Sequence, residues 1–312
     1  MRNIFCCLVM FFLVLEGVAE EMKMLMIGNS FSVCVGYNLP KIVKADGKHH
    51  LILTSAHIGG CSLETHANYR KKAQADPSID PYGIIIWDSA EPKKKKEYKG
   101  NLLELLKNNR YDIVTIQQAS HFSWNPASYQ PFANEIIRCI RQYNPQARIL
   151  IQQTWSYRKD DPRLTPAGWG FDQQGMHERI RAAYHKLAKE TSLELIPTGD
   201  AIALWRQNHK PAYIPLTAAE RAQYRHPDLP PQSDDIVGRD FWSKQKDGTM
   251  TLDADRIHLN RKGEYLQSCV WYGFIFKEDP TAVPWKPRDI SRGDCQELSA
   301  AAKAALTAAG VL

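Results

Sequence analysis

A serine near one end of the chain and an aspartate–histidine pair near the other end together contain the groups of a nucleophilic catalytic site. Ser30 follows an apolar segment, and Asp255 precedes His258 by three residues. In a tight turn, this spacing lets the Asp255 carboxylate bind one imidazole nitrogen and leave the other nitrogen free for a hydroxyl group. The pattern predicts that Ser30 is a nucleophile, His258 its base and Asp255 the group that orients the base.

Each part also has a simpler interpretation. A serine at the start of a helix is favoured as an N-cap, and an Asp-x-x-His pair also occurs as a surface ion pair or at a helix start. The Gly-x-Ser-x-Gly elbow of α/β-hydrolases is absent around Ser30. The catalytic interpretation therefore requires a fold that brings residues 30 and 258 together.

Short apolar segments that alternate with helical patterns predict such a fold. The expected strands are 23–27, 51–54, 113–116, 149–151 and 193–196, with 84–87 as a candidate edge strand. The expected helices are 102–108, 129–143, 174–191 and 262–276. This alternation is typical of the α/β class, in which helices cover both faces of an open parallel sheet.

Glycine or polar residues follow four of the expected strands, at residues 28–30, 59–60, 117–118 and 152–155. Ligands of open α/β sheets bind at the carboxyl ends of the strands. The four segments therefore predict one shared site, although strand ends also become polar simply because they leave the core.

Two polar segments, at about 64–100 and 205–250, interrupt this pattern and are expected to be inserted loops. The first contains the lysine run 93–96. We interpret this run as a solvated loop, with contact to an anionic polymer as the alternative.

The N-terminus has the features of a secretory signal peptide. Arg2 precedes an apolar run from Ile4 to Leu15, and Gly17-Val18-Ala19 offers small residues for cleavage after Ala19. The run is shorter than the roughly 20 residues that span a bilayer, and no later segment is long and apolar enough to do so. We expect residues 20–312 to form a single domain that is secreted or periplasmic, with no stable membrane insertion after cleavage.

Composition excludes several classes of protein. The 312 residues are 44% hydrophobic and 24% charged, which excludes collagen-like, low-complexity and coiled-coil proteins. A net charge of +6 is too small to imply a nucleic-acid partner. Five cysteines follow the signal peptide, without a metal-binding spacing and with at least one left unpaired. The histidines show no metal-ligand spacing either, so we expect no metal and no cofactor.

Several of these segments resemble a known family. Gly28-Asn29-Ser30-Phe31-Ser32, the glycines at 59 and 60, and Asp255-x-x-His258 occur in the order of the SGNH (GDSL-type) hydrolases. The stretches GGCSLETH, YDIVTIQQAS, ILIQQTWSYR and DRIHLNRKGEYL are similar to a branch of uncharacterised function found in exported bacterial proteins. The resemblance implies a flavodoxin-like, three-layer α/β/α sandwich with about five strands, and the triad roles given above.

The resemblance also implies an oxyanion hole made of the Ser30 N–H, a glycine N–H and a side-chain amide after the third strand. We expect the glycine to be Gly60 rather than Gly59. The usual asparagine position holds His121, but a glutamine found in related carbohydrate esterases matches Gln118. We therefore expect Gln118 to be the third donor, with His121 as the second choice. The alternative role for Gln118 is a structural amide at a strand end.

These features together predict a secreted serine esterase that removes an O-acyl group, most simply acetyl, from a carbohydrate. Candidate substrate contacts are Asn29, His66, His121, Trp155 and Tyr157, of which the last two offer rings for a sugar or simply pack. The partner is then a small-molecule or polysaccharide ester. Alternatives are a lipase, thioesterase or arylesterase with the same triad, and a non-catalytic carbohydrate-binding protein. The sequence leaves the oligomeric state open.

Overall fold

The computed structural model describes residues 20–232 and 234–312, so the expected signal peptide lies outside the described residues. No helix of the described part is both long and apolar enough to cross a membrane. The strands are β1 (Glu21–Gly28), β2 (His50–His57), β3 (Tyr82–Asp88), β4 (Lys95–Gly100), β5 (Ile113–Ile116), β6 (Arg148–Gln152), β7 (Glu194–Ile196), β8 (Val237–Lys244) and β9 (Met250–Leu259).

The α-helices are α1 (Ser30–Val33), α2 (Leu39–Asp46), α3 (Leu63–Ala75), α4 (Leu102–Asn108), α5 (Phe132–Tyr143), α6 (Gln173–Thr191), α7 (Thr198–Asn208), α8 (Ala218–Arg221), α9 (Arg261–Phe276) and α10 (Arg292–Ala308). The 3-10 turns are η1 (Cys34–Tyr37), η2 (Pro126–Ser128) and η3 (Pro280–Ala282).

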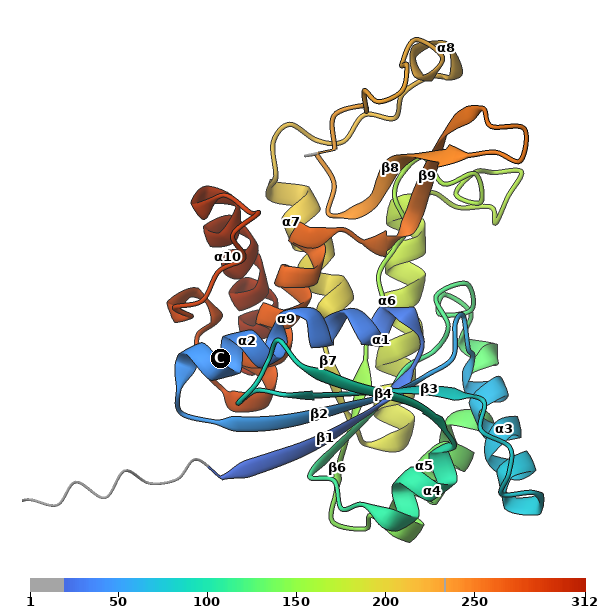
Figure 1. The fold of residues 1–312 in the computed structure, drawn as a ribbon, viewed down its shortest axis with the longest axis vertical. Coiled ribbons are helices and arrows are strands. Elements are labelled where there is room, and N and C mark those ends of the chain that lie inside the picture. The colour runs from blue at the N-terminus through green and yellow to red at the C-terminus, as the bar shows by residue number, and fades with distance from the viewer. Residues whose placement is uncertain (1–19, 233) are drawn as a thin grey trace, which may run out of the picture.

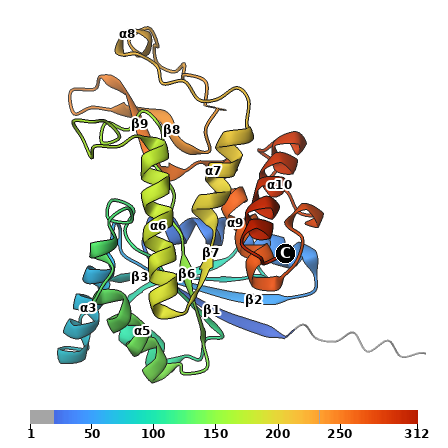
Figure 2. The same cartoon turned by 180° about the vertical axis from the view of Figure 1, so that it is seen from behind.

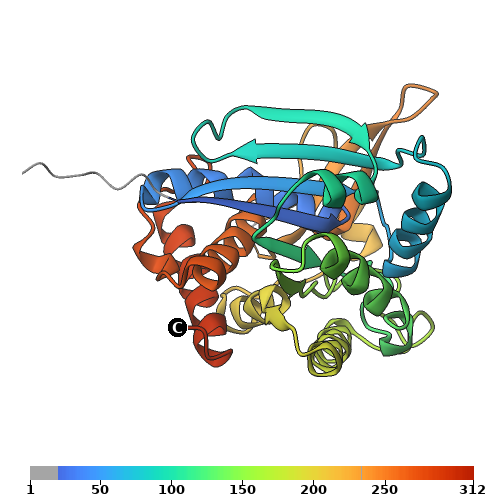
Figure 3. The same cartoon turned by 90° about the horizontal axis from the view of Figure 1, so that it is seen from below.

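The central sheet has the strand order β4-β3-β2-β1-β5-β6-β7 in the described residues. The strands from β2 to β7 in this order are parallel, and β3 and β4 are added antiparallel at one side. In Figure 1, α2 and α9 lie above the sheet and α4 and α5 below it, and Figure 3 shows from below how the strands lie side by side. The predicted α/β/α sandwich is confirmed, and its five predicted strands are the five parallel ones.

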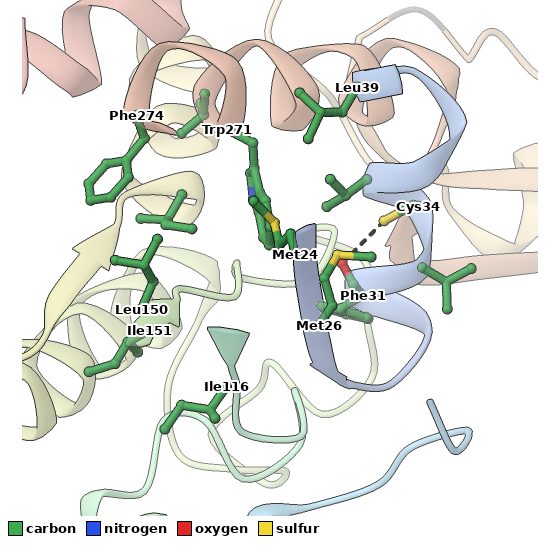
Figure 4. Close-up of a cluster of buried hydrophobic side chains, with 14 of the residues drawn as sticks. Met24, Met26, Phe31, Cys34, Leu39, Ile116, Leu150, Ile151, Trp271 and Phe274 are labelled. Carbon is green, nitrogen blue, oxygen red and sulfur yellow. Dashed lines mark hydrogen bonds between the residues drawn. The ribbon is translucent and has the colours of Figure 1, made fainter. Parts of the chain in front are cut away.

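Strand β1 lies at the centre of the sheet because its side chains are apolar on both faces. Residues from Met24 to Gly28 are buried without interruption, as expected for a parallel strand covered by helices on both sides. Figure 4 shows Trp271 reaching from α9 toward Met24, while Met26 lies beside Phe31 of the segment that follows β1. This packing fixes the carboxyl end of β1, from which Ser30 follows.

The expectation of an inserted loop at 64–100 is wrong, because this segment contains most of α3 together with β3 and β4. The candidate edge strand 84–87 lies within β3, but β3 pairs on both sides and β4 is the edge. Strand β4 begins at Lys95, inside the lysine run, and its first five residues are exposed. It lacks an apolar face to reveal it in the sequence, and its charges protect an open sheet edge.

The expectation of a loop at 205–250 is correct only in part. The described residues 209–232 and 234–236 are largely irregular, apart from the short helix α8. Strand β8 then pairs with β9 in an antiparallel ribbon that is separate from the central sheet. Figures 1 and 2 show this ribbon beyond the helices on one side of the sheet, and its second strand leads into α9. The ribbon carries Asp255 and His258.

Candidate active site

Ser30 is the first residue of α1, immediately beyond the carboxyl end of β1. Asn29 caps this helix, because its Oδ1 accepts a hydrogen bond from the Phe31 N–H at 3.0 Å. The Asn29 carbonyl accepts another from the Ser32 hydroxyl at 2.8 Å. Asn29 is only 2% exposed, so the prediction that it contacts substrate is wrong in this structure. It instead fixes the backbone that presents Ser30.

Asp255 and His258 lie in a bulge of β9 rather than in the predicted tight turn. Leu259 pairs with Val237 and Asp255 pairs with Arg239, so three residues of β9 lie opposite the single residue Gly238. In a regular strand, residues three apart point to opposite faces. The bulge changes the direction of the side chains, so that Asp255 and His258 can face each other. Gly238 has a φ of +88°, and a Cβ there would lie 2.6 Å from the Asp255 carbonyl oxygen, so the bulge requires glycine.

The bulge turns the Asp255 carboxylate toward the imidazole. Asp255 Oδ1 accepts the N–H groups of Ile257 at 2.9 Å and of His258 at 3.1 Å, and Oδ2 lies 2.8 Å from His258 Nδ1. Burial raises the pKa of Asp255, but the hydrogen bonds from the imidazole and the two N–H groups outweigh it and hold this pKa well below its ordinary value. The carboxylate is therefore ionised and acts only as an acceptor.

The structure brings the three predicted triad residues together. His258 Nε2 lies 2.8 Å from Ser30 Oγ. Because the Asp255 carboxylate only accepts, the proton of the neutral imidazole lies on Nδ1, and the lone pair on Nε2 faces the serine hydroxyl. This arrangement can take the proton of Ser30 as its oxygen attacks a carbonyl carbon.

Trp155 supports the segment that carries the histidine. Its side chain is fully buried, its ring stacks on Phe31 with 4.0 Å between centroids, and its Nε1 donates to the Ile257 carbonyl at 2.9 Å. Trp155 nevertheless lines the same cavity as Ser30 and His258, so its contact with substrate stays a prediction. Tyr157 is also fully buried, with its hydroxyl 2.9 Å from Ser120 Oγ, and the prediction that its ring contacts substrate is wrong in this structure.

Buried ion pairs anchor the ribbon to the loop that follows β6. Arg158 is 3% exposed and pairs with Asp160 at 2.6 Å and with Asp240 of β8 at 3.1 Å. Arg256 of β9 pairs with Asp160 at 2.9 Å. Asp160 thus joins arginines from both segments. The network holds Asp255 and His258 in place over Ser30 from outside the central sheet.

The loops that follow β1 and β2 each offer one backbone N–H group to an oxyanion. The N–H groups of Ser30 and Gly60 have no hydrogen-bond acceptor among the described residues. Asn29 Nδ2 donates to the Cys61 carbonyl at 3.1 Å, and the Ile58 N–H donates to the Gly28 carbonyl at 3.3 Å. These contacts tie the Gly60 loop to the nucleophile loop. Gly60 has a φ of +62°, a backbone conformation that favours glycine.

Gln118 does not supply the third oxyanion donor. Its Nε2 donates to the Ser128 carbonyl at 2.8 Å, and its Oε1 accepts the Leu63 N–H at 3.0 Å and the Ala119 N–H at 2.8 Å. Gln118 is therefore the structural amide that was the alternative interpretation. The His121 ring is tilted against that of Phe122 with 4.3 Å between ring centroids, and no described contact joins it to the triad.

His66 is a structural residue rather than a substrate contact. It is completely buried, and its Nδ1 lies 2.9 Å from the Tyr82 hydroxyl. Burial lowers the pKa of His66 to about 3. The imidazole is therefore neutral in the folded protein across the mildly acidic range in which it takes up a proton in the unfolded chain.

This histidine predicts a pH dependence of stability. Between about pH 6.5 and pH 3 the unfolded chain binds one proton more than the folded protein at His66, so stability falls as the pH falls through this range. We expect the His66→Asn variant to lose about 2 kcal/mol less unfolding free energy than the parent between pH 7 and pH 5. Urea unfolding at both pH values measures this difference. The exposed-site variant His185→Asn should keep the parental slope, and parental behaviour of His66→Asn would refute the assignment.

One wall of the site consists of residues that were not predicted from the sequence. A cavity of about 710 Å³ opens over the triad, and its other lining residues include Tyr37, Arg239, Arg261 and Glu264. Burial raises the pKa of Glu264. Arg261 lies three residues after His258, so its closeness to the Asp-x-x-His motif was a signal for it in the sequence. Arg239 gave no such signal, because it reaches the site only through the pairing of β8 with β9.

The described residues contain no group of three or more His, Cys, Asp or Glu side chains that could hold a metal ion. All five cysteines after the expected signal peptide are buried and unpaired. Cys34 is the one that lines the cavity, and burial raises the pKa of its thiol far above the ordinary value. The Cys34 thiol therefore stays protonated, and Ser30 is the side chain of this cavity whose hydroxyl contacts His258.

A family model for a domain of unknown function, DUF4886, matches residues 23–226. The chain belongs to the DUF4886 family. A DUF4886 family protein from Bacteroides uniformis has the same fold, with a TM-score of 0.72 and 24% sequence identity over 92% of this chain and 95% of that chain. No curated protein matches the chain.

The matching structures also include a proposed SGNH hydrolase from Slackia heliotrinireducens, with a TM-score of 0.47 and 17% identity over 81% of this chain and 97% of that chain. Another is a proposed GDSL-like lipase from Parabacteroides merdae, with a TM-score of 0.45 and 12% identity over 82% and 96% of the two chains. The chemistry of the site follows from the triad geometry of this chain.

Proposed function

We propose that this DUF4886 family protein is a serine hydrolase that cleaves an ester by way of an acyl-enzyme. The observation that carries the proposal is the 2.8 Å contact between Ser30 Oγ and His258 Nε2, with Asp255 bound behind the ring at 2.8 Å. A structural N-cap serine has no need of an oriented base. The simpler interpretations of Ser30 and of the Asp-x-x-His pair therefore account for less of the geometry.

The reaction follows from the positions of these groups. Ser30 Oγ attacks the acyl carbon while its proton moves to His258 Nε2, and the carbonyl oxygen gains a negative charge, which we propose is stabilised by the N–H groups of Ser30 and Gly60. The C–O bond to the alcohol then breaks, and the leaving oxygen takes the proton from His258. A water molecule repeats the attack on the acyl-enzyme with the same base. The products are a carboxylic acid and free Ser30.

A polar alcohol is the substrate that fits the cavity best, and we propose an O-acyl group, most simply acetyl, on a carbohydrate. The support is the charged wall of Arg239, Arg261 and Glu264, which a fatty acyl chain would desolvate at a cost. The expected signal peptide would place such an enzyme outside the cytoplasm. Because the side chains of Trp155 and Tyr157 are buried, the proposal does not depend on them.

A substrate panel tests this proposal. Release of acid is measured for acetylated oligosaccharides and for a series of 4-nitrophenyl esters from acetyl to lauroyl. We expect acetyl to be the best acyl group of the series and acetylated sugars to be hydrolysed. Preference for long acyl chains over every acetylated sugar would favour a lipase. Failure to hydrolyse any ester would favour the non-catalytic binding protein.

A further inference from the structure

A second cavity lies between α2, the turn that joins β3 to β4, and Trp285, and it is rich in lysine. It has a volume of about 540 Å³, and its lining includes four lysines, one carboxylate and one indole: Lys41, Lys44, Lys93, Lys94, Glu91 and Trp285. The lysine run noted in the sequence thus contributes to a concave surface. It is not only a solvated loop.

Most of these ammonium groups lack a counter-ion. Lys94 pairs with Glu91 at 2.6 Å, and Lys44 donates to the Ala90 carbonyl at 2.7 Å. Lys41 and Lys93 have no carboxylate within 4.0 Å among the described residues. Burial lowers the pKa of Lys41, and the nearby charge of Arg261 lowers it further. An anion in this cavity would relieve the repulsion among these cations.

Trp285 adds an aromatic surface to the cationic one. Its ring is partly exposed, with Lys41 Nζ 5.6 Å from its centroid and the Tyr265 ring 6.2 Å away. An accessible indole offers a flat apolar face to the C–H groups of a sugar ring while its neighbours bind polar substituents. Cations beside an accessible aromatic ring therefore suit a ligand that is both cyclic and anionic.

The second cavity is connected to the active site along one stretch of chain. Ser30 and Tyr37 line the first cavity, and Lys41 and Lys44 of α2 line the second. Figure 1 shows α1 and α2 in line above the sheet. The fifteen residues from Ser30 to Lys44 belong almost entirely to α1, η1 and α2, and at the rise of an α-helix they would span about 20 Å. Arg261 lines the first cavity, and its charge acts on Lys41 of the second, so a cation lies at the end of each cavity nearest the other.

We propose that the two cavities form one track for an anionic polysaccharide, whose esterified unit lies at Ser30 and whose chain continues over Trp285. This inference rests on the proposed function only for the ester. Arg239 supports it at the catalytic end, because it lines the first cavity and has no carboxylate partner within 4.0 Å among the described residues. The acidic groups of the chain would take the place of the missing counter-ions.

Binding is tested separately from hydrolysis in the Ser30→Ala background. The ligands are an unesterified oligogalacturonate of about eight units, a sulfated oligosaccharide, a neutral oligosaccharide of similar length, and polyglutamate. Titration calorimetry should show binding of at least one anionic sugar, weakening with added salt, and much weaker binding of the neutral sugar. The carboxylated and sulfated arms identify the acidic group.

Variants locate the binding surface. Lys93→Gln/Lys94→Gln removes one unpaired and one paired lysine from the track, and we expect it to weaken anionic sugar binding about tenfold. The matched control Lys186→Gln/Lys189→Gln removes the same charge from α6, where Lys186 pairs with Glu190 and Lys189 has no ion pair in the described structure, and should bind like the parent. Trp285→Ala should weaken sugar binding more than polyglutamate binding. Circular dichroism checks that each variant is folded.

Any of three results would contradict the proposed track. The first is that neutral and anionic sugars bind equally well, and the second is that polyglutamate binds as well as the anionic sugar. The third is that the α6 control variant loses as much binding affinity as the Lys93→Gln/Lys94→Gln variant. Because the ligands are unesterified and Ser30 is replaced, none of these results bears on whether the protein hydrolyses esters. Conversely, binding without any ester hydrolysis by the parent would leave the track standing and refute the proposed function.

Discussion

Replacing Ser30 by alanine should lower kcat for a small activated ester such as 4-nitrophenyl acetate by about 10³-fold or more. Ser30 Oγ is the atom that lies 2.8 Å from His258 Nε2, and alanine removes it while leaving the oxyanion N–H groups in place. The effect should fall on kcat rather than on KM, because the lost interaction is the bond formed in the reaction. Initial rates over a range of ester concentrations separate the two.

The control for Ser30→Ala is an equivalent change at a serine distant from the triad. Ser78 lies in an exposed loop, where its hydroxyl binds Asp76 at 2.7 Å, and Ser78→Ala should keep the parental rate. Ser30→Ala removes only an oxygen atom at the start of a short helix and should leave the circular dichroism spectrum unchanged. A folded Ser30→Ala variant with the parental rate would show that another group attacks the ester.

Asp255→Asn should lower kcat about 10⁴-fold, the size of effect seen when a triad aspartate becomes an amide. The asparagine Oδ1 can still accept the N–H groups of Ile257 and His258, so the bulge persists. Its Nδ2 would donate toward His258 Nδ1, which moves the ring proton to Nε2. Nε2 then donates to Ser30 instead of accepting its proton. The variant therefore keeps the arrangement of the site but loses the general base.

Asp253→Asn is the matched control for this change, since Asp253 lies on the same strand and binds the Ser243 hydroxyl. It should retain the parental kcat within a few-fold, because it contacts no member of the triad. The parental enzyme should keep Asp255 ionised into strong acid, because its hydrogen bonds hold its pKa well below the ordinary range. If Asp255→Asn retains the parental kcat while folded, the proposed role of the carboxylate is wrong.

The central sheet and the triad could be predicted because their signals are local or carried by short motifs. The parallel strands β1, β2, β5 and β6 each contain a short run of mostly apolar, buried residues, such as that from Met24 to Ile27. Strand β7 is shorter and begins with the exposed Glu194. Ser30 follows one of these runs directly. Asp255 and His258 are close in sequence, so their contact needed only a local bend, although the bend is a bulge in a strand.

The remaining features depend on partners that are distant in the sequence. Strand β4 is almost entirely exposed and has no apolar pattern, and β8 exists through its pairing with β9. Trp155 and Tyr157 follow a strand, as aromatic residues that bind ligands often do. In the structure, however, Phe31 stacks on Trp155, and the Tyr157 hydroxyl lies within hydrogen-bond distance of Ser120. Gln118 has the amide that an oxyanion hole needs, and its bonds to Ser128 and Leu63 are visible only in three dimensions.

The central claim is that Ser30 is a nucleophile activated by His258 and Asp255, and covalent labelling tests it most directly. The protein is incubated with a fluorophosphonate, which bonds to activated serines with loss of fluoride, and the adduct is located by peptide mass spectrometry. We expect one adduct per chain, on Ser30, that forms far more slowly in the Asp255→Asn variant and is absent from Ser30→Ala. Labelling of a different serine, or labelling that persists in Ser30→Ala, would contradict the proposed mechanism.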